Sequence, residues 1–322
     1  MKAFSEPLVQ SSFPLFALQL SDDLTVIGGG GGASKSGVPN QVQVYKNQEL
    51  LTHYDFGSDL VIALYQIEQT TNYIVLTTKS VNLLQLEADK LTLINSHTLA
   101  EEPQGYCYTP DFLVVGFPNK LVYFTFSGKI AIAATQNIVS ENVKITRIQS
   151  FAKNFLVVIT KQNILKIALP KQFNEKSAED QTEIEIEYPN TIVQLNENTI
   201  ATLVMNKKTN KTNLIIFDQD FKVVKHHFVK GLITNLVYSG DLFYTMSSEG
   251  LIQVFDYSFK LLLKKQTEIT EMITNMQVNN KRIVVTGIDA FQTIKLEDKS
   301  VSMCAAMSIS CLIVSFIYVM MM

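Results

Sequence analysis

Residues 241–256 read DLFYTMSSEGLIQVFD, and this stretch indicates how the whole chain folds. An apolar run is followed by a Ser-Ser-Glu-Gly turn, a second apolar run and the pair Phe255-Asp256. Two short apolar runs joined by a glycine-containing turn are typical of a β-hairpin. The final pair stands where Trp-Asp or a similar pair ends the third strand of a WD repeat. The stretch therefore predicts the middle hairpin of a propeller blade.

The same pattern recurs along the chain. Residues 198–218 have a longer loop and end in Phe217-Asp218, and residues 281–296 look like a third copy. Short apolar runs follow one another at intervals of about ten residues, which is typical of an all-β propeller or sandwich array. Grouped in fours, they predict seven blades of roughly 40 residues, the usual period of such repeats. The predicted blades lie near residues 13–54, 60–97, 104–134, 143–187, 191–228, 232–265 and 271–296.

The last predicted blade contains only three apolar runs. Closure of the ring then requires a strand from residues 1–10, which would join the two ends of the propeller. The sequence contains no tryptophan, so the signature Trp-Asp pair is absent. We therefore predict an all-β, seven-bladed WD-repeat-like β-propeller over residues 1–299.

Composition narrows the classes of function. The net charge is −3 and charged residues are mixed along the chain, which argues against a nucleic-acid-binding face. The three cysteines have no ligand-like spacing, and His226 and His227 would point to opposite faces of a strand, so neither a zinc site nor a disulfide framework is predicted. No Ser/His/Asp or paired-carboxylate constellation stands out, so we do not expect an enzyme with covalent chemistry.

The C-terminal segment differs from the rest of the chain. From Ser300 to Met322 there is no charged residue. About twenty residues in a helix span roughly the 30 Å hydrocarbon core of a bilayer. We predict a transmembrane tail anchor over residues 302–322, with a buried core helix as the alternative. Charged residues flank it only on its N-terminal side, which places residues 1–299 in the cytosol.

A second unusual stretch is residues 28–40, GGGGGASKSGVPN. It fails the Walker A pattern because Ser34 replaces the required second glycine, and because the following QVQVYK alternates like a strand. A flexible hairpin tip is one interpretation. The other is an ordered loop that holds a cation on backbone carbonyls, with Pro39 restricting the backbone and Asn40 bonding back into the loop. A cage of carbonyls suits K⁺ better than Mg²⁺.

The run Phe13-Pro14-Leu15-Phe16-Ala17, the glycines, and Gly37-Val38-Pro39-Asn40 before a strand resemble the first blade of the Sec-twelve family. Its animal member is called prolactin regulatory element-binding protein. Members are guanine-nucleotide exchange factors for the Sar GTPase, which starts COPII coat assembly in ER-to-Golgi protein transport. The resemblance implies a seven-bladed propeller facing the cytosol and a C-terminal helix in the endoplasmic reticulum membrane. The chain differs in having five consecutive glycines and in ending at the predicted helix.

The resemblance also implies roles for individual residues. Asn40 matches a functionally important asparagine of the family, and we expect it to be the residue on which catalysis of GDP release depends most. Gly28 to Gly32 and Gly37 would form the ion-holding loop, with potassium on the carbonyls of Gly30, Gly31, Gly32 and Gly37. The GTPase-binding loop would comprise Gly28, Gly29, Gly30, Gly31, Gly32, Ser34, Lys35, Gly37, Val38, Pro39 and Asn40.

The sequence is therefore compatible with two functions. The first is an exchange factor for a Sar-type small GTPase at the ER membrane. The alternative is a tail-anchored WD-repeat scaffold that binds peptides on one face of the propeller and has no exchange activity.

Overall fold

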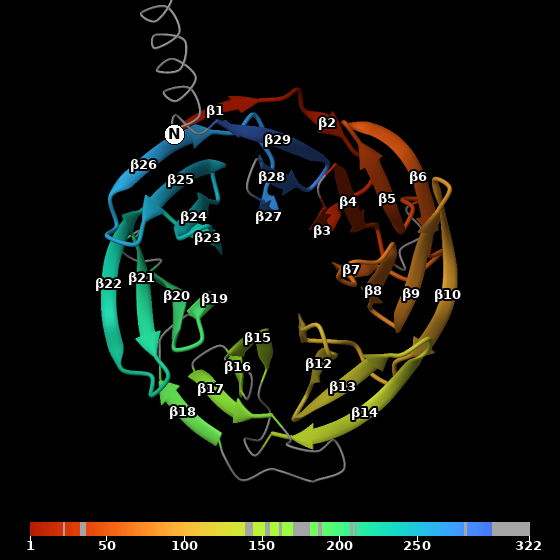
Figure 1. The fold of residues 1–322 in the computed structure, drawn as a ribbon, viewed down its shortest axis with the longest axis horizontal. Coiled ribbons are helices and arrows are strands. Elements are labelled where there is room, and N and C mark those ends of the chain that lie inside the picture. The colour runs from red at the N-terminus through yellow and green to blue at the C-terminus, as the bar shows by residue number, and fades with distance from the viewer. Residues whose placement is uncertain are drawn as a thin grey trace, which may run out of the picture.

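The computed structural model describes residues 1–297 except 22, 33–36, 139–143, 152–154, 161–162, 170–180, 186–188, 207–208, 210 and 280–281. The regular secondary structure of these described residues consists of β-strands, which form seven antiparallel sheets. Figure 1 shows the sheets as blades arranged around a central opening. The predicted all-β, seven-bladed propeller is confirmed.

Blades 1 to 3 follow the chain in order. Their strands are β3 (Leu15–Leu20), β4 (Leu24–Gly29), β5 (Gln41–Lys46) and β6 (Glu49–Asp55); β7 (Val61–Gln66), β8 (Asn72–Thr77), β9 (Ser80–Glu87) and β10 (Lys90–Thr98); β11 (Gly105–Tyr108), β12 (Leu113–Phe117), β13 (Lys120–Phe126) and β14 (Ile130–Asn137).

Blades 4 to 6 repeat this arrangement. Their strands are β15 (Ile145–Phe151), β16 (Phe155–Thr160), β17 (Asn163–Ala168) and β18 (Gln181–Glu185); β19 (Pro189–Asn196), β20 (Thr199–Asn206), β21 (Lys211–Asp218) and β22 (Val223–Lys230); β23 (Ile233–Ser239), β24 (Leu242–Ser247), β25 (Leu251–Asp256) and β26 (Leu261–Gln266).

Blade 7 joins the two ends of the described chain. It contains β27 (Ile273–Val278), β28 (Arg282–Gly287) and β29 (Ala290–Glu297), and β1 (Lys2–Ser5) is its outermost strand. β1 pairs antiparallel with β29 from Lys2 opposite Glu297 to Ser5 opposite Ile294, and the short β2 (Val9–Gln10) pairs with the same strand. The prediction that a strand from residues 1–10 closes the ring is confirmed.

The core lies between the blades. Seven clusters of buried apolar side chains occur in the described residues, one at each contact between neighbouring blades. In the middle strand β12, for example, Leu113 and Val115 pack against blade 2 and Val114 packs against blade 4. Successive side chains of a strand point to opposite faces, so a strand buried on both faces must be apolar throughout. This explains why the middle strands read as continuous apolar runs.

The innermost strands share one irregularity. Six of the seven, all except β11, have a register shift near their first residue. The extra residue in each is Phe16, Ile62, Thr146, Asn190, Thr234 or Thr274. A bulge disrupts the ladder locally, and three of the extra residues are threonines whose hydroxyls donate to carbonyls of the facing strand, at 3.1, 3.4 and 3.1 Å.

No helix in the described part of the chain is long and apolar enough to cross a membrane. The predicted tail anchor over residues 302–322 lies outside the described residues.

Candidate functional site

The glycine run does not form a loop from its first residue. β4 continues through Gly28 and Gly29, which pair with Ala17 and Leu15 of β3 and with β5 on the other side. A Cβ on Gly28 would lie 2.7 Å from Val61 Cγ1, and one on Gly29 would lie 1.8 Å from the Pro14 carbonyl oxygen. The prediction that the loop begins at Gly28 is therefore wrong by two residues. Close packing at the inner edge of blade 1, rather than ion binding, requires these two glycines.

The loop itself spans residues 30–40. Gly30 donates a 2.9 Å hydrogen bond from its backbone N–H to the Pro14 carbonyl, and a Cβ on it would lie 2.1 Å from Asn40 Oδ1. Gly32 and Gly37 have φ of +72° and +74°, a left-handed conformation that favours glycine. Nothing lies within 4 Å of a Cβ placed at either residue.

Asn40 is buried at the base of this loop, with 1% of its surface exposed. Its Oδ1 accepts a 2.8 Å hydrogen bond from the Gly32 N–H, and its Nδ2 donates to the Gly32 carbonyl at 3.1 Å. The same Nδ2 donates to the Gly57 carbonyl at 2.7 Å, and the Asn40 carbonyl accepts from the Phe56 N–H at 2.8 Å. The prediction that Asn40 bonds back into the loop is confirmed. Because its side chain is buried and bonded, Asn40 is a positioning residue for the loop.

The rest of the predicted loop divides into two parts. Ser34 and Lys35 lie outside the described residues. Gly37 is exposed, whereas Val38 and Pro39 are partly buried, and Val38 packs against the apolar cluster between blades 7 and 1. The loop is thus held at its base and reaches solvent at Gly37.

The predicted metal ligands are backbone carbonyls of Gly30, Gly31, Gly32 and Gly37. The described residues contain no group of three or more His, Cys, Asp or Glu side chains that could hold a metal ion. The Gly32 carbonyl already accepts one hydrogen bond from Asn40, and a carbonyl oxygen has a second lone pair. A donor set of carbonyls without carboxylates fits a monovalent cation better than Mg²⁺.

A groove of about 480 Å³ lies beside the loop. Gly32, Leu60, Lys79, Glu101 and Glu102 are among its lining residues. Leu60 also lines the cavity of the central channel, so the glycine loop and that cavity open at the same end of the propeller.

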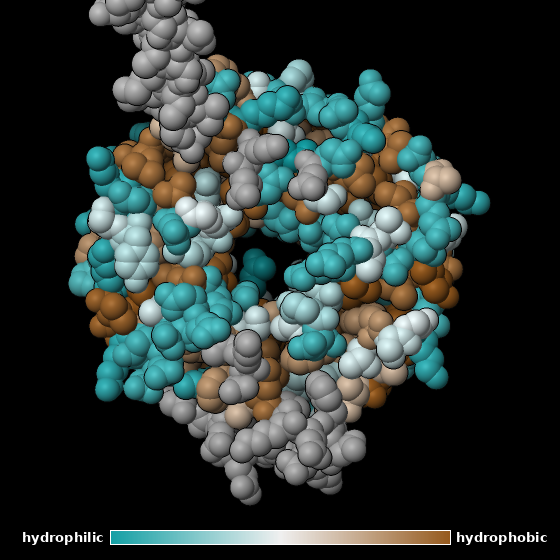
Figure 2. Space-filling model, viewed as in Figure 1, coloured by the Kyte–Doolittle hydropathy of each residue, from teal (hydrophilic) through white to brown (hydrophobic). Residues whose placement is uncertain are grey.

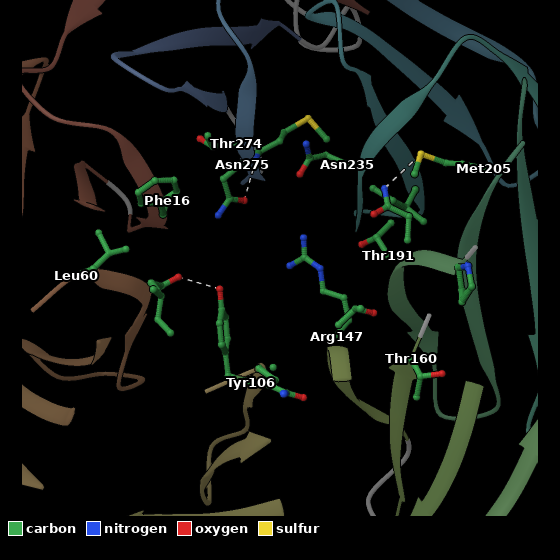
Figure 3. A pocket seen from close by; sticks show the side chains of 18 residues that line it. Phe16, Leu60, Tyr106, Arg147, Thr160, Thr191, Met205, Asn235, Thr274 and Asn275 are labelled. Carbon is green, nitrogen blue, oxygen red and sulfur yellow. Dashed lines mark hydrogen bonds between the residues drawn. The ribbon is translucent and has the colours of Figure 1, made fainter. Parts of the chain in front are cut away.

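The channel cavity has a volume of about 680 Å³ and is lined by side chains from all seven blades. Figure 3 shows them converging on an open space, with the Arg147 guanidinium reaching into it. Arg147 is the one charged side chain among the described lining residues. Figure 2 shows the opening at the centre of the ring, with mostly hydrophilic residues around it. Sequence reasoning missed Arg147, because an isolated arginine in a predicted blade carries no signal.

Tyr106 and Cys107 lie near Arg147, and the pKa values of both side chains are shifted. Tyr106 donates a 2.8 Å hydrogen bond from its hydroxyl to the Ile62 carbonyl, and burial raises its pKa although the Arg147 charge acts in the opposite direction. Burial raises the pKa of the Cys107 thiol to about 11. A thiol that stays protonated at neutral pH is a weak nucleophile.

Comparison with solved structures supports the fold. No family model and no curated protein matches the sequence. The structure is similar to virginiamycin B lyase from Staphylococcus aureus, with a TM-score of 0.66 and 12% identity over 92% of this chain and 99% of that one. It is also similar to the computationally designed Ika8 protein, with a TM-score of 0.62 and 12% identity over 90% of this chain and 98% of that one. At this level of identity the likeness supports a seven-bladed β-propeller and no particular activity.

Proposed function

We propose that this protein is a guanine-nucleotide exchange factor for a Sar-type small GTPase, acting at the endoplasmic reticulum membrane to start COPII coat assembly. The observation that carries the proposal is the buried Asn40, which ties the glycine loop to the connection between β6 and β7. A glycine-rich hairpin tip with no function has no need of a buried side chain at its base.

The proposed mechanism needs no covalent chemistry. The loop of residues 30–40 binds the GTPase most tightly when its nucleotide site is empty, and this difference in affinity shifts the equilibrium toward release. The loop displaces the GTPase segments that cover the nucleotide, GDP leaves and GTP takes its place. A bound potassium ion would supply a positive charge at the carbonyls of Gly30, Gly31, Gly32 and Gly37. The segment of residues 302–322 would keep the activated GTPase at the membrane.

The test is GDP release from a Sar GTPase in the presence of residues 1–299. Asn40→Ala should slow release strongly, because the loop loses its attachment to the connection between β6 and β7. Asn82→Ala is the matched control: Asn82 lies on the third strand of blade 2, is buried, and donates to the Val75 carbonyl and to Ser80 Oγ. Equal loss of activity in both variants would mean that Asn40 contributes only general stability, and the loop mechanism would be wrong.

The ion is tested separately. Replacing K⁺ by Na⁺ or Li⁺ should lower exchange activity if the cation orders the loop. Unchanged activity would contradict the ion and leave the loop mechanism standing.

A second candidate is a tail-anchored scaffold without exchange activity. It is favoured by the channel cavity, which is large enough to admit a peptide segment. Binding of the chain to nucleotide-free Sar GTPase separates the two, because a scaffold of this kind has no preference for the empty GTPase.

A further inference from the structure

The two arginines of this chain have opposite surroundings. Arg282, on β28, donates to the carbonyls of Ser21 and Leu24 at 2.7 and 2.8 Å. The backbone of Arg147 pairs with β16, but its side chain makes no hydrogen bond or ion pair with any residue in the described part of the chain. Its guanidinium instead extends into the channel cavity (Figure 3). Arg282 therefore holds blade 7 against blade 1. The Arg147 side chain makes no such hydrogen bond with the described residues.

The backbone directs Arg147 to the channel. The bulge at Thr146 adds one residue to β15, and the Thr146 hydroxyl donates to the Ile159 carbonyl at 3.1 Å. On either side of Thr146 and Arg147, the side chains of Ile145 and Ile148 are buried in the cluster between blades 3 and 4. Buried neighbours on both sides hold this part of β15 in place, so Arg147 is presented from a rigid strand.

The surroundings of Arg147 are polar but uncharged. No acidic residue is among the described residues that line the cavity. Asn235 and Asn275 come from blades 6 and 7, and Figure 3 shows both facing the same space as Arg147. Asn275 Oδ1 accepts from the Met276 N–H at 2.8 Å, whereas its Nδ2 has no partner among the described residues. The cavity therefore offers one full positive charge and at least one unused amide donor.

The single positive charge and the uncharged lining of the cavity indicate which class of ligand it can bind. A guanidinium pairs well with a carboxylate through two parallel hydrogen bonds. Nucleotides and other polyanions are usually held by several cations or by clustered backbone N–H groups, which this cavity does not show among its described residues. The apolar side chains of Phe16, Leu60 and Met276 also line it. Apolar surface combined with a single charge suits an extended peptide that carries an acidic side chain.

We propose that the channel cavity binds an acidic peptide segment of a partner protein, with Arg147 as the residue that recognises its carboxylate. The site is distinct from the glycine loop, although both open at the same end of the propeller. It therefore does not depend on the exchange activity proposed above.

The test is selection of random peptides of one fixed length, displayed on phage, against the full chain in detergent. With the wild-type chain, the selected peptides should be enriched in Asp and Glu. Arg147→Gln should abolish the enrichment, and Arg147→Glu should replace it with enrichment in Lys and Arg. Lys264→Gln is the matched control, because Lys264 is an exposed residue on β26, the outermost strand of blade 6, and its replacement removes the same charge far from the channel.

A synthetic copy of the most enriched peptide then gives the affinity by fluorescence anisotropy. We expect Arg147→Gln to weaken binding about tenfold or more, as for loss of a charge-assisted pair, and Lys264→Gln to leave it unchanged. The same unfolding midpoint for both variants would exclude misfolding as the cause. The proposal is overturned if the wild-type chain selects no acidic peptides, or if Arg147→Gln selects them as the wild type does.

Discussion

The side-chain amide nitrogen of Asn40 donates a 2.7 Å hydrogen bond to the carbonyl oxygen of Gly57. The two residues lie on different connections, Asn40 at the end of the glycine loop and Gly57 between β6 and β7. The same nitrogen also donates to the Gly32 carbonyl. One buried amide thus links the glycine loop of blade 1 to the start of blade 2.

Replacing Asn40 should cost stability as well as activity. Asn40→Ala removes three hydrogen bonds and leaves the Gly57 carbonyl without this donor. We expect the free energy of unfolding to fall by about 2–4 kcal/mol, at about 1 kcal/mol or more for each buried hydrogen bond lost. Asn40→Asp should cost more at neutral pH, because a carboxylate would face two carbonyls. Urea unfolding measures both, and a midpoint unchanged in both variants would contradict the geometry at this site.

The five glycines should respond differently to alanine. Gly29→Ala and Gly30→Ala place a Cβ at 1.8 Å from the Pro14 carbonyl and at 2.1 Å from Asn40 Oδ1, so both should severely lower the melting temperature. Gly32→Ala has open space and only the strain of a left-handed backbone, at about 1–2 kcal/mol. Thermal unfolding of the three variants gives the order. A Gly32→Ala variant as unstable as Gly29→Ala would contradict the close approach of the Pro14 carbonyl to Gly29.

The two arginines provide a matched pair for stability. Arg282→Gln removes the donors to the Ser21 and Leu24 carbonyls at the junction of blades 7 and 1. We expect a loss of about 2–3 kcal/mol and faster amide exchange in β1 and β29, because the junction opens first. Arg147→Gln, which breaks no side-chain hydrogen bond or ion pair among the described residues, should change stability by less than about 0.5 kcal/mol. Hydrogen exchange followed by mass spectrometry checks both, and equal protection of β1 in the two variants would refute the role of Arg282.

Because of Cys107, the free energy of unfolding should depend on pH in the alkaline range. Burial raises the pKa of its thiol from 9.0 to about 11. Above pH 9.0 the unfolded chain loses this proton while the folded chain keeps it. The contribution of the buried thiol to the free energy of unfolding is therefore complete below pH 9.0 and is lost as the pH rises through about 11. The wild type should therefore lose about 2–3 kcal/mol more than Cys107→Ala over this range. Unfolding midpoints at several pH values test this, and parallel curves for the two proteins would exclude a buried, protonated thiol.

Thiol labelling gives an independent check on Cys107. In a chain whose Cys304 and Cys311 are replaced by serine, the folded protein should react with a maleimide far more slowly at pH 8 than the unfolded one, since only the thiolate reacts. Fast labelling of the folded chain would show that Cys107 is accessible.

Seven blades and the closing strand at residues 1–10 could be predicted from the sequence alone. Each strand is a short apolar run ended by turn residues, so the signal is local, and the repeat adds the same signal seven times. The bond from Asn40 to Gly32 was also predictable, because the two residues belong to one loop.

Tertiary structure decided the rest. Gly28 and Gly29 belong to β4 because they pair with β3 and β5. They must be glycine because Val61 and the Pro14 carbonyl approach them from other segments, and no pattern within the glycine run reveals that approach. The bond from Asn40 to Gly57 depends on how blade 2 follows blade 1. Arg147 faces a channel that exists only when all seven innermost strands surround it, since a channel is a property of the closed ring and not of any one strand.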